Sequence, residues 1–168
     1  MSLGDTDRRP PWDAVSLVSF DTGAAVDRSY LGLTLTATGS PTFTSRYLSL
    51  DGVDDWISIP DNAAHRTYPM TACIWFNMNG NDQAQYASII DKYSSASLNG
   101  WQIFAHDDEK IYAYYLGQSL SNCIYGGGVS ALNTGATSYR TAGWTHLAVV
   151  FSSSGGEIFV NGASVDTQ

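Results

Sequence analysis

The sequence predicts an all-β fold, an antiparallel sandwich of two sheets in the jelly-roll class. Short runs rich in β-branched and aromatic residues recur at fairly regular spacing, with Gly, Pro, Asn and Asp between them. No stretch keeps a helical apolar period for long. Only 14% of the residues are charged, which suits short strands and many turns better than long solvated helices.

The N-terminal half is predicted to hold short strands, each a run of strand-forming residues bounded by turn residues. These strands are expected at residues 15–20, 33–37, 47–50 and 56–59. The last two flank the acidic segment 51–55, so we predict that they form a hairpin. A single helical turn is expected within residues 62–68.

Residues 71–78 alternate between two kinds of side chain, as in a strand with one buried face. The predicted inward set is Ala72, Ile74, Phe76 and Met78, and the predicted outward set is Thr71, Cys73, Trp75 and Asn77.

The strand series continues, with strands expected at residues 88–90, 101–105, 111–116, 122–125 and 136–139. Residues 106–109 form the turn between the second and third of these. The clearest β signal lies at residues 144–151 and 157–160, joined by a Ser/Gly turn. Asn161-Gly162 predicts a tight hairpin turn, which leaves residues 163–168 for a return strand.

Charge and composition exclude several function classes. The net charge is −8, from 8 basic and 16 acidic residues, so no nucleic-acid partner is expected. The longest aliphatic runs are far too short to span a bilayer, so no membrane insertion is expected. Cys73 and Cys123 could form at most one bridge, and we expect two reduced thiols.

We predict one domain, from Trp12 to Gln168. Residues 1–11 are a polar lead-in that is expected to be flexible, and residues 1–3 could be vector-derived. The lead-in has no apolar segment, so no secretory signal is expected.

Several segments in order resemble the LamG-like (laminin G / pentraxin, concanavalin A-like) jelly rolls. They are residues 48–61, 71–76, 143–150 and 158–162, and residues 12–21 resemble the lead strand of such domains in phage structural and tail-fibre proteins. The resemblance runs from about Trp12 to the end. It implies the fold, but it says little about function, because the fold hosts lectins, glycosidases, adhesion modules and inert spacers.

The chain also departs from this family. LamG-like domains continue past the Asn-Gly hairpin with two more strands, so the domain is expected to be C-terminally truncated. The resemblance places Asn99 near an earlier pentraxin calcium ligand, but Leu98 stands where that family has Asp. Cys73 matches half of the pentraxin disulfide, whose partner position falls near Ala148, so that bridge cannot form.

Calcium is the cofactor that the acidic hairpin suggests, because hard cations bind clustered carboxylates in loops. The candidate ligands are Asp51, Asp54, Asp55 and Asp61. In the alternative interpretation Asp51-Gly52 makes a turn and the other carboxylates cap it. The three histidines show no metal-ligand spacing, so zinc is not expected.

An enzyme is not expected. Glycoside hydrolysis needs a pair of carboxylates in a cleft, whereas the two glutamates, Glu109 and Glu157, do not lie in such a strand. No Gly-x-Ser-x-Gly elbow occurs. We interpret His146 as a buried, hydrogen-bonded structural histidine rather than a catalytic base.

Exposed aromatic rings are natural platforms for sugars. Trp75 lies on the outward side of its strand, and Trp101, Tyr112 and Tyr114 could lie on neighbouring strands of the same sheet. Together with Asn99 they are the candidate ligand-binding residues. The alternative is that these rings fill a secondary core or an interface.

The sequence therefore predicts a non-catalytic carbohydrate-binding or adhesion module that recognises a glycan or cell-surface ligand, extracellular or virion-associated. The alternative is a structural or oligomerisation domain of a phage-like particle with no small-molecule ligand. In that case the strand at residues 15–20, left with an unpaired edge, is expected to pair with another copy as a homo-oligomer.

Overall fold

Strands form nearly all of the regular structure, which confirms the predicted all-β, antiparallel fold. The computed structural model describes residues 14–20, 23–78, 87–93, 100–116, 132–133, 139, 143–152 and 155–167. A short 3₁₀ helix, η1 (Ala63–Arg66), lies where a helical turn was predicted. Within these described ranges, no helix has the length and apolar character needed to cross a membrane. The chain divides into two compact units, the first ending at His65 and the second beginning at Arg66.

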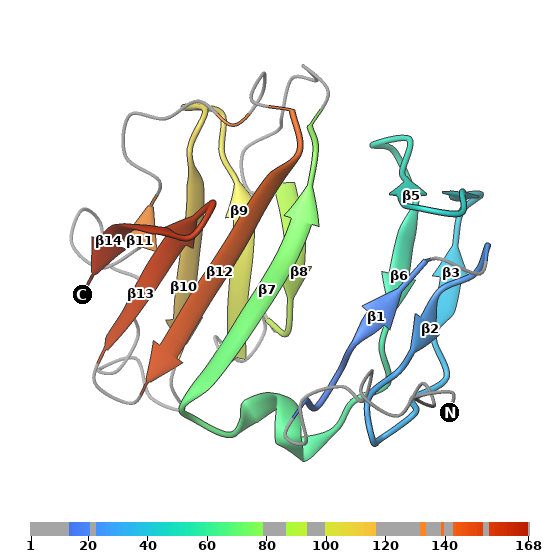
Figure 1. The fold of residues 1–168 in the computed structure, drawn as a ribbon, viewed down its shortest axis with the longest axis horizontal. Coiled ribbons are helices and arrows are strands. Elements are labelled where there is room, and N and C mark those ends of the chain that lie inside the picture. Colours follow the sequence, from blue (N-terminus) through green and yellow to red (C-terminus); the bar gives the residue numbers. More distant parts are fainter. Residues whose placement is uncertain are drawn as a thin grey trace, which may run out of the picture. The chain divides into compact units, whose positions relative to one another are not determined.

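The first unit is built from pairs of very short antiparallel strands (Figure 1). The pairs are β1 (Val18–Ser19) with β2 (Val26–Asp27), β3 (Thr36–Thr38) with β6 (Trp56–Ser58), and β4 (Thr42–Phe43) with β5 (Leu48–Ser49).

The predicted hairpin between residues 47–50 and 56–59 is wrong, because β5 pairs with β4 and β6 pairs with β3. Thr44 closes the β4–β5 hairpin. Its hydroxyl oxygen accepts N–H bonds from Arg46 and Tyr47 (3.1 and 2.9 Å), and its own N–H donates to the Tyr47 carbonyl (3.0 Å). A threonine that bonds the neighbouring backbone makes a turn without Gly or Pro, so the pattern of turn residues did not indicate it.

Asp27, buried at the end of β2, connects the loops of the first unit. Its Oδ1 accepts N–H bonds from Leu17 (3.0 Å) and Ser29 (2.9 Å). Its Oδ2 accepts bonds from the Leu33 N–H (2.9 Å) and the Ser29 hydroxyl (3.0 Å). Burial by itself raises the pKa of this carboxyl, but the hydrogen bonds outweigh it and the pKa lies below its ordinary value.

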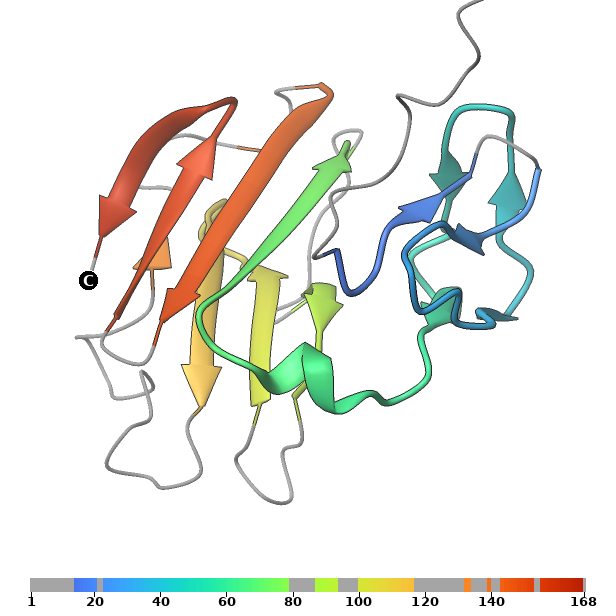
Figure 2. The same ribbon diagram turned by 60° about the horizontal axis from the view of Figure 1, so that its bottom comes forward.

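The second unit contains two four-stranded antiparallel sheets, which lie as two layers (Figures 1 and 2). The first sheet has, in order, β14 (Ala163–Thr167), β13 (Gly155–Val160), β12 (Thr145–Ser152) and β7 (Met70–Phe76). The second has, in order, β11 (Leu132–Asn133), β10 (Ile111–Leu116), β9 (Gly100–Ala105) and β8 (Ala87–Asp91). This arrangement confirms the predicted two-sheet sandwich.

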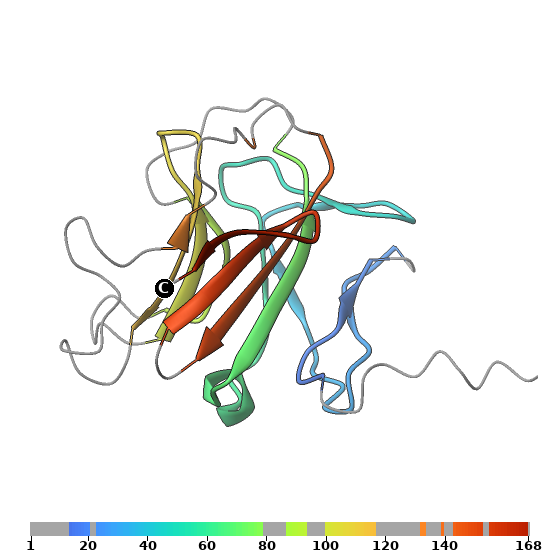
Figure 3. The same cartoon turned by 60° about the vertical axis from the view of Figure 1, so that its left-hand side comes forward.

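The side chains of β12 alternate strictly, and the inward ones fill the space between the two layers from the side of the first sheet. Leu147 and Val149 are 0% exposed and Phe151 is 1% exposed, whereas the residues between them are only half-buried. Each of these three residues pairs with an inward residue of β7, which runs beside β12 (Figure 3). β12 and the edge strand β7 therefore present one apolar side to the core.

The predicted faces of residues 71–78 are confirmed. Ala72 and Phe76 are buried in the core cluster, and Ile74 and Met78 pack against it. The outward set is exposed throughout, and its members are Thr71, Cys73, Trp75 and Asn77.

The remaining predictions for the second unit are mostly confirmed. β8, β9 and β10 cover the predicted ranges, and β9 and β10 form a hairpin. β11 was not predicted, residues 122–125 lie outside the described residues, and Tyr139, the one described residue of 136–139, is buried but not in a strand. In the predicted β13–β14 hairpin, Asn161 and Gly162 have φ angles of 50° and 83°, the positive values that a type I′ turn needs.

Gly100 should tolerate no side chain. Its φ is +106°, and a Cβ there would lie 1.7 Å from the Lys92 carbonyl oxygen. We expect Gly100→Ala to lower the free energy of unfolding by at least about 2 kcal/mol, measured by urea denaturation. Gly143→Ala is the control, because Gly143 has φ +74° but nothing within 4 Å. Equal losses in the two variants would contradict the steric explanation.

Asp27 should make the first unit sensitive to acid. Because the folded pKa lies below the unfolded value of about 3.9, the stabilisation is present above that value and is lost as the pH falls through the folded pKa. Asp27→Asn places an amide N–H₂ against the Leu33 N–H and should cost about 1–3 kcal/mol at pH 7. Denaturation followed between pH 2 and 7 tests this. A variant with wild-type stability and acid dependence would refute it.

Candidate functional site

The predicted aromatic residues do not share one sheet. Trp75 lies on β7 of the first sheet, whereas Trp101 and Tyr112 lie on β9 and β10 of the second, so the prediction of a common sheet is wrong. Trp101 is 6% exposed and its ring lies 5.7 Å from that of Phe151 in the core. All of β9 is buried on both faces. A strand of this kind lacks the alternation of apolar and polar residues that would distinguish an exposed side from a buried one.

Tyr112 is half-buried and hydrogen-bonded rather than open. Its ring stacks on Phe104 with centroids 5.5 Å apart and planes 14° apart, and its hydroxyl donates to Asp108 (2.7 Å). Burial, followed by that hydrogen bond, raises the pKa of Tyr112 to about 12. Tyr114 lies on β10 opposite Gln102, and Asn99 lies outside the described residues.

The carboxylates of the β9–β10 turn are occupied by contacts within the turn. The His106 Nδ1 lies 2.7 Å from Asp107 and 3.3 Å from Asp108, and the Lys110 ammonium lies 3.4 Å from Asp108. The Tyr139 hydroxyl donates to the His106 carbonyl (2.7 Å). These contacts fit a structural role in closing the hairpin.

The side chains of the first sheet that point away from the core form a surface that we call the outer face. Cross-strand register places them in rows, since Trp75 pairs with His146, Cys73 with Ala148, and Ala148 with Phe159. The members are Thr71, Cys73, Trp75, His146, Ala148, Val150, Glu157, Phe159 and Ser164. None of them belongs to the apolar core cluster of the described residues.

Trp75 is the most open ring of this face, with 62% of its surface exposed. Its ring lies 5.1 Å from that of His146, at an interplanar angle of 49°. The backbone of His146 is fixed by Asn161, because the His146 N–H donates to Asn161 Oδ1 (3.0 Å) and the Asn161 N–H donates to the His146 carbonyl (2.8 Å). The pair is thus held on the hydrogen-bonded neighbours β7, the edge strand of the sheet, and β12.

The prediction of a buried His146 is wrong. The histidine is half-buried on the outer face, because Leu147 and Val149 take the inward positions of β12. Sequence reasoning also missed Asn161 as a neighbour of this site. The Trp75–His146 pair comes from the register between β7 and β12, which the alternation of either strand does not specify.

Glu157 is the one acidic residue of the outer face, and it accepts a bond from the Ser164 hydroxyl (2.5 Å). No lysine or arginine belongs to the outer face as defined here. Cys73 carries a free thiol, and burial raises its pKa, so it is protonated near neutral pH. Cys123 lies outside the described residues. The surface around Trp75 is therefore aromatic and weakly polar.

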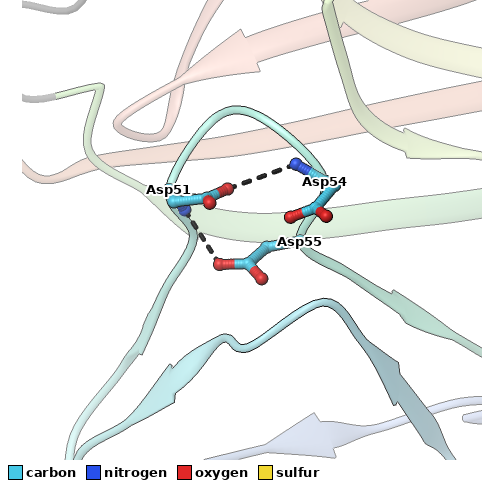
Figure 4. A group of neighbouring side chains, drawn as sticks. All are labelled: Asp51, Asp54 and Asp55. Atoms are coloured by element: carbon cyan, nitrogen blue, oxygen red, sulfur yellow. Dashed lines mark hydrogen bonds between the residues drawn. The ribbon is translucent and has the colours of Figure 1, made fainter.

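The acidic loop of the first unit brings together Asp51, Asp54 and Asp55, each offering an oxygen within 4.8 Å of the others (Figure 4). Asp51 Oδ1 accepts N–H bonds from Val53 (2.8 Å) and Asp54 (3.3 Å), and these bonds hold the Asp51 pKa below its ordinary value. Asp55 accepts the Asp51 N–H (3.0 Å) and, at its other oxygen, the Ser40 N–H (2.6 Å). This pattern fits the capped-turn interpretation.

A calcium ion takes six to eight oxygens, at about 2.3–2.6 Å. Three carboxylates fit part of such a set, and waters or carbonyls would have to complete it. Asp61 does not belong to this group, although it was a candidate ligand. Calcium binding at Asp51, Asp54 and Asp55 stays a prediction.

Comparison with known proteins gives a family and a fold. A family model described as the concanavalin A-like lectin/glucanases superfamily matches residues 51–168. No curated protein matches the chain. The binding domain of Paraclostridial Mosquitocidal Protein 1 has a similar structure, with a TM-score of 0.69 and 14% identity over 92% of this chain and 39% of that one. An S-layer domain-containing protein from Clostridium thermocellum matches with a TM-score of 0.49 and 24% identity, over 91% and 71% of the two chains.

The two faces of the first sheet should respond differently to truncation. Trp75→Ala removes a ring that is 62% exposed, so the free energy of unfolding should change by less than about 1 kcal/mol. Phe151→Ala removes a ring that is 1% exposed and should cost about 3–5 kcal/mol. Chemical denaturation measures both. A Trp75→Ala loss as large as that of Phe151→Ala would place Trp75 in a packed core.

Proposed function

The chain belongs to the concanavalin A-like lectin/glucanases superfamily, and on that premise we propose that it is a non-catalytic module that binds carbohydrate. The observation that carries this proposal is Trp75. Its ring is 62% exposed on a sheet strand and is not part of the core. A large apolar ring held open to water on a rigid element is typical of a binding surface.

Stacking on Trp75 is the physical basis of the proposal. The C–H faces of a sugar ring are apolar, and an indole offers them a flat area of matching character. The His146 ring, 5.1 Å away, supports one side of the platform and offers hydrogen-bonding nitrogens. Asn161, bonded to the His146 backbone, keeps that neighbour in place.

The charges of the outer face support a binding role over hydrolysis. Glycosidases use a pair of carboxyl groups about 5–9.5 Å apart. The outer face holds one carboxylate, Glu157, which is bonded to Ser164. The paired carboxylates of Asp107 and Asp108 contact His106 and close a turn.

One structural neighbour is compatible with this proposal. The mosquitocidal protein is a larger chain, of which this one covers 39%, and the matching structure is titled a binding domain. At 14% identity the likeness supports the fold, so the ligand class comes from the exposed platform rather than from that protein.

Association with another protein chain is the second candidate function. Large apolar side chains are exposed around the acidic loop of the first unit: Leu50 is 49%, Val53 86% and Trp56 50% exposed. Clustered exposed apolar residues often mark protein interfaces. Light scattering of the wild type and of Val53→Asp would detect such assembly as a mass that falls in the variant.

Carbohydrate binding should depend on Trp75. We expect Trp75→Ala to weaken binding to a polysaccharide that the wild type binds by about two- to tenfold, because one stacked ring contributes about 0.5–1.5 kcal/mol. Affinity electrophoresis over a polysaccharide panel, followed by calorimetry on those that bind, measures this.

Trp56→Ala is the matched control, since Trp56 is also an exposed tryptophan, on β6 of the first unit. Both variants should keep the wild-type circular dichroism spectrum. Absence of binding to every polysaccharide, or equal losses in the two variants, would defeat the proposal.

A further inference from the structure

Among the described residues of the second unit, no lysine or arginine lies on the outer face around Trp75. Within the outer face as its residues are described, Glu157 is the one formally charged side chain. Resting on the proposed function, we infer that the outer face selects uncharged polysaccharides and rejects sulfated or carboxylated ones.

The described cations of the second unit lie elsewhere. Lys92 directly follows β8, and Lys110 precedes β10 and pairs with Asp108 (3.4 Å), so both belong to the opposite sheet. Arg66 ends η1, before the start of β7. That strand begins at Met70, and Trp75 lies near its other end, about 16 Å from Met70 at ~3.3 Å per residue.

The cost of removing water from an anion makes the outer face selective, because none of its described residues is a cation that could replace that water. A sulfate or carboxylate pressed against the Trp75 ring loses part of its water shell, which is costly unless a cation or hydrogen-bond donors replace it. The neighbours of Trp75 in the register are His146 across the strand and Cys73 and Ala148 in the next row. None of these neighbours carries a cation that would compensate an anion, whereas a sugar hydroxyl is uncharged and costs far less to desolvate.

The negative charges of the chain also disfavour an anionic ligand. Glu157 pairs with Val150, four residues along β12 from His146, so it repels an anion that extends along the face. The chain as a whole carries a net charge of −8, which lowers the local concentration of anions. Neither Glu157 nor the net charge affects the binding of an uncharged polysaccharide.

Matched polymers test the inference. Dextran, mannan, galactan and β-glucan are each compared with their sulfated derivatives by affinity electrophoresis at pH 8. We expect at least one neutral polymer to bind, its sulfated form to bind at least tenfold more weakly, and the neutral affinity to stay constant as NaCl rises. Tighter binding of a sulfated form, weakened by salt, would overturn the inference.

A charge variant makes the test specific to this surface. Cys73 is exposed two residues before Trp75 on the same face, so Cys73→Lys puts a cation beside the platform. We expect it to raise binding of the sulfated polymer at least tenfold. Ser45→Lys, at an exposed turn of the first unit, adds the same charge and should not.

The outcomes separate this inference from the proposed function. If sulfated polymers bind best and Trp75→Ala removes that binding, carbohydrate binding at Trp75 stands and the selectivity is wrong. If no polymer of either series binds, the proposed function fails and the inference fails with it. An equal gain in Cys73→Lys and Ser45→Lys would show that net charge, and not the outer face, controls selection.

Discussion

The antiparallel register between β7 and β12 determines the second unit. Because side chains alternate across a strand, burying Leu147 and Val149 against β7 forces His146 onto the opposite side, directly across from Trp75. A shift of one residue would move the apolar set into water and the Trp75–His146 pair into the core. The stability of the sandwich and the chemistry of the outer face thus depend on the same pairing.

The two sheets use their aromatic residues in different ways. On β7 one face is solvated, so Trp75 can serve as a platform. On β9 both faces are buried, so Trp101 packs in the core, and Phe104 is 2% exposed beneath the Tyr112 ring. An aromatic residue in a strand therefore indicates a binding surface only where its own side of the strand is open to solvent and the other side is buried.

The first unit is organised by carboxylates and backbone N–H groups more than by an apolar core. None of the described buried apolar residues precedes Ala72, whereas Asp27 is buried and accepts bonds from Leu17, Ser29 and Leu33. Asp55 similarly joins the acidic loop to Ser40. Side-chain bonds of this kind compete with regular strand pairing, which accounts for the very short strands.

The sequence by itself determined the sandwich class, the strands β7, β8, β9, β10 and β12 to β14, the Asn161-Gly162 turn, and the outward position of Trp75. These follow from local alternation and turn chemistry, which neighbouring residues specify. Only the tertiary structure decided that β6 pairs with β3, that Trp101 is buried, and that His146 faces outward beside Trp75. Each of these depends on which distant strand lies alongside or above, and an alternating pattern gives a strand two faces without saying which neighbour covers them.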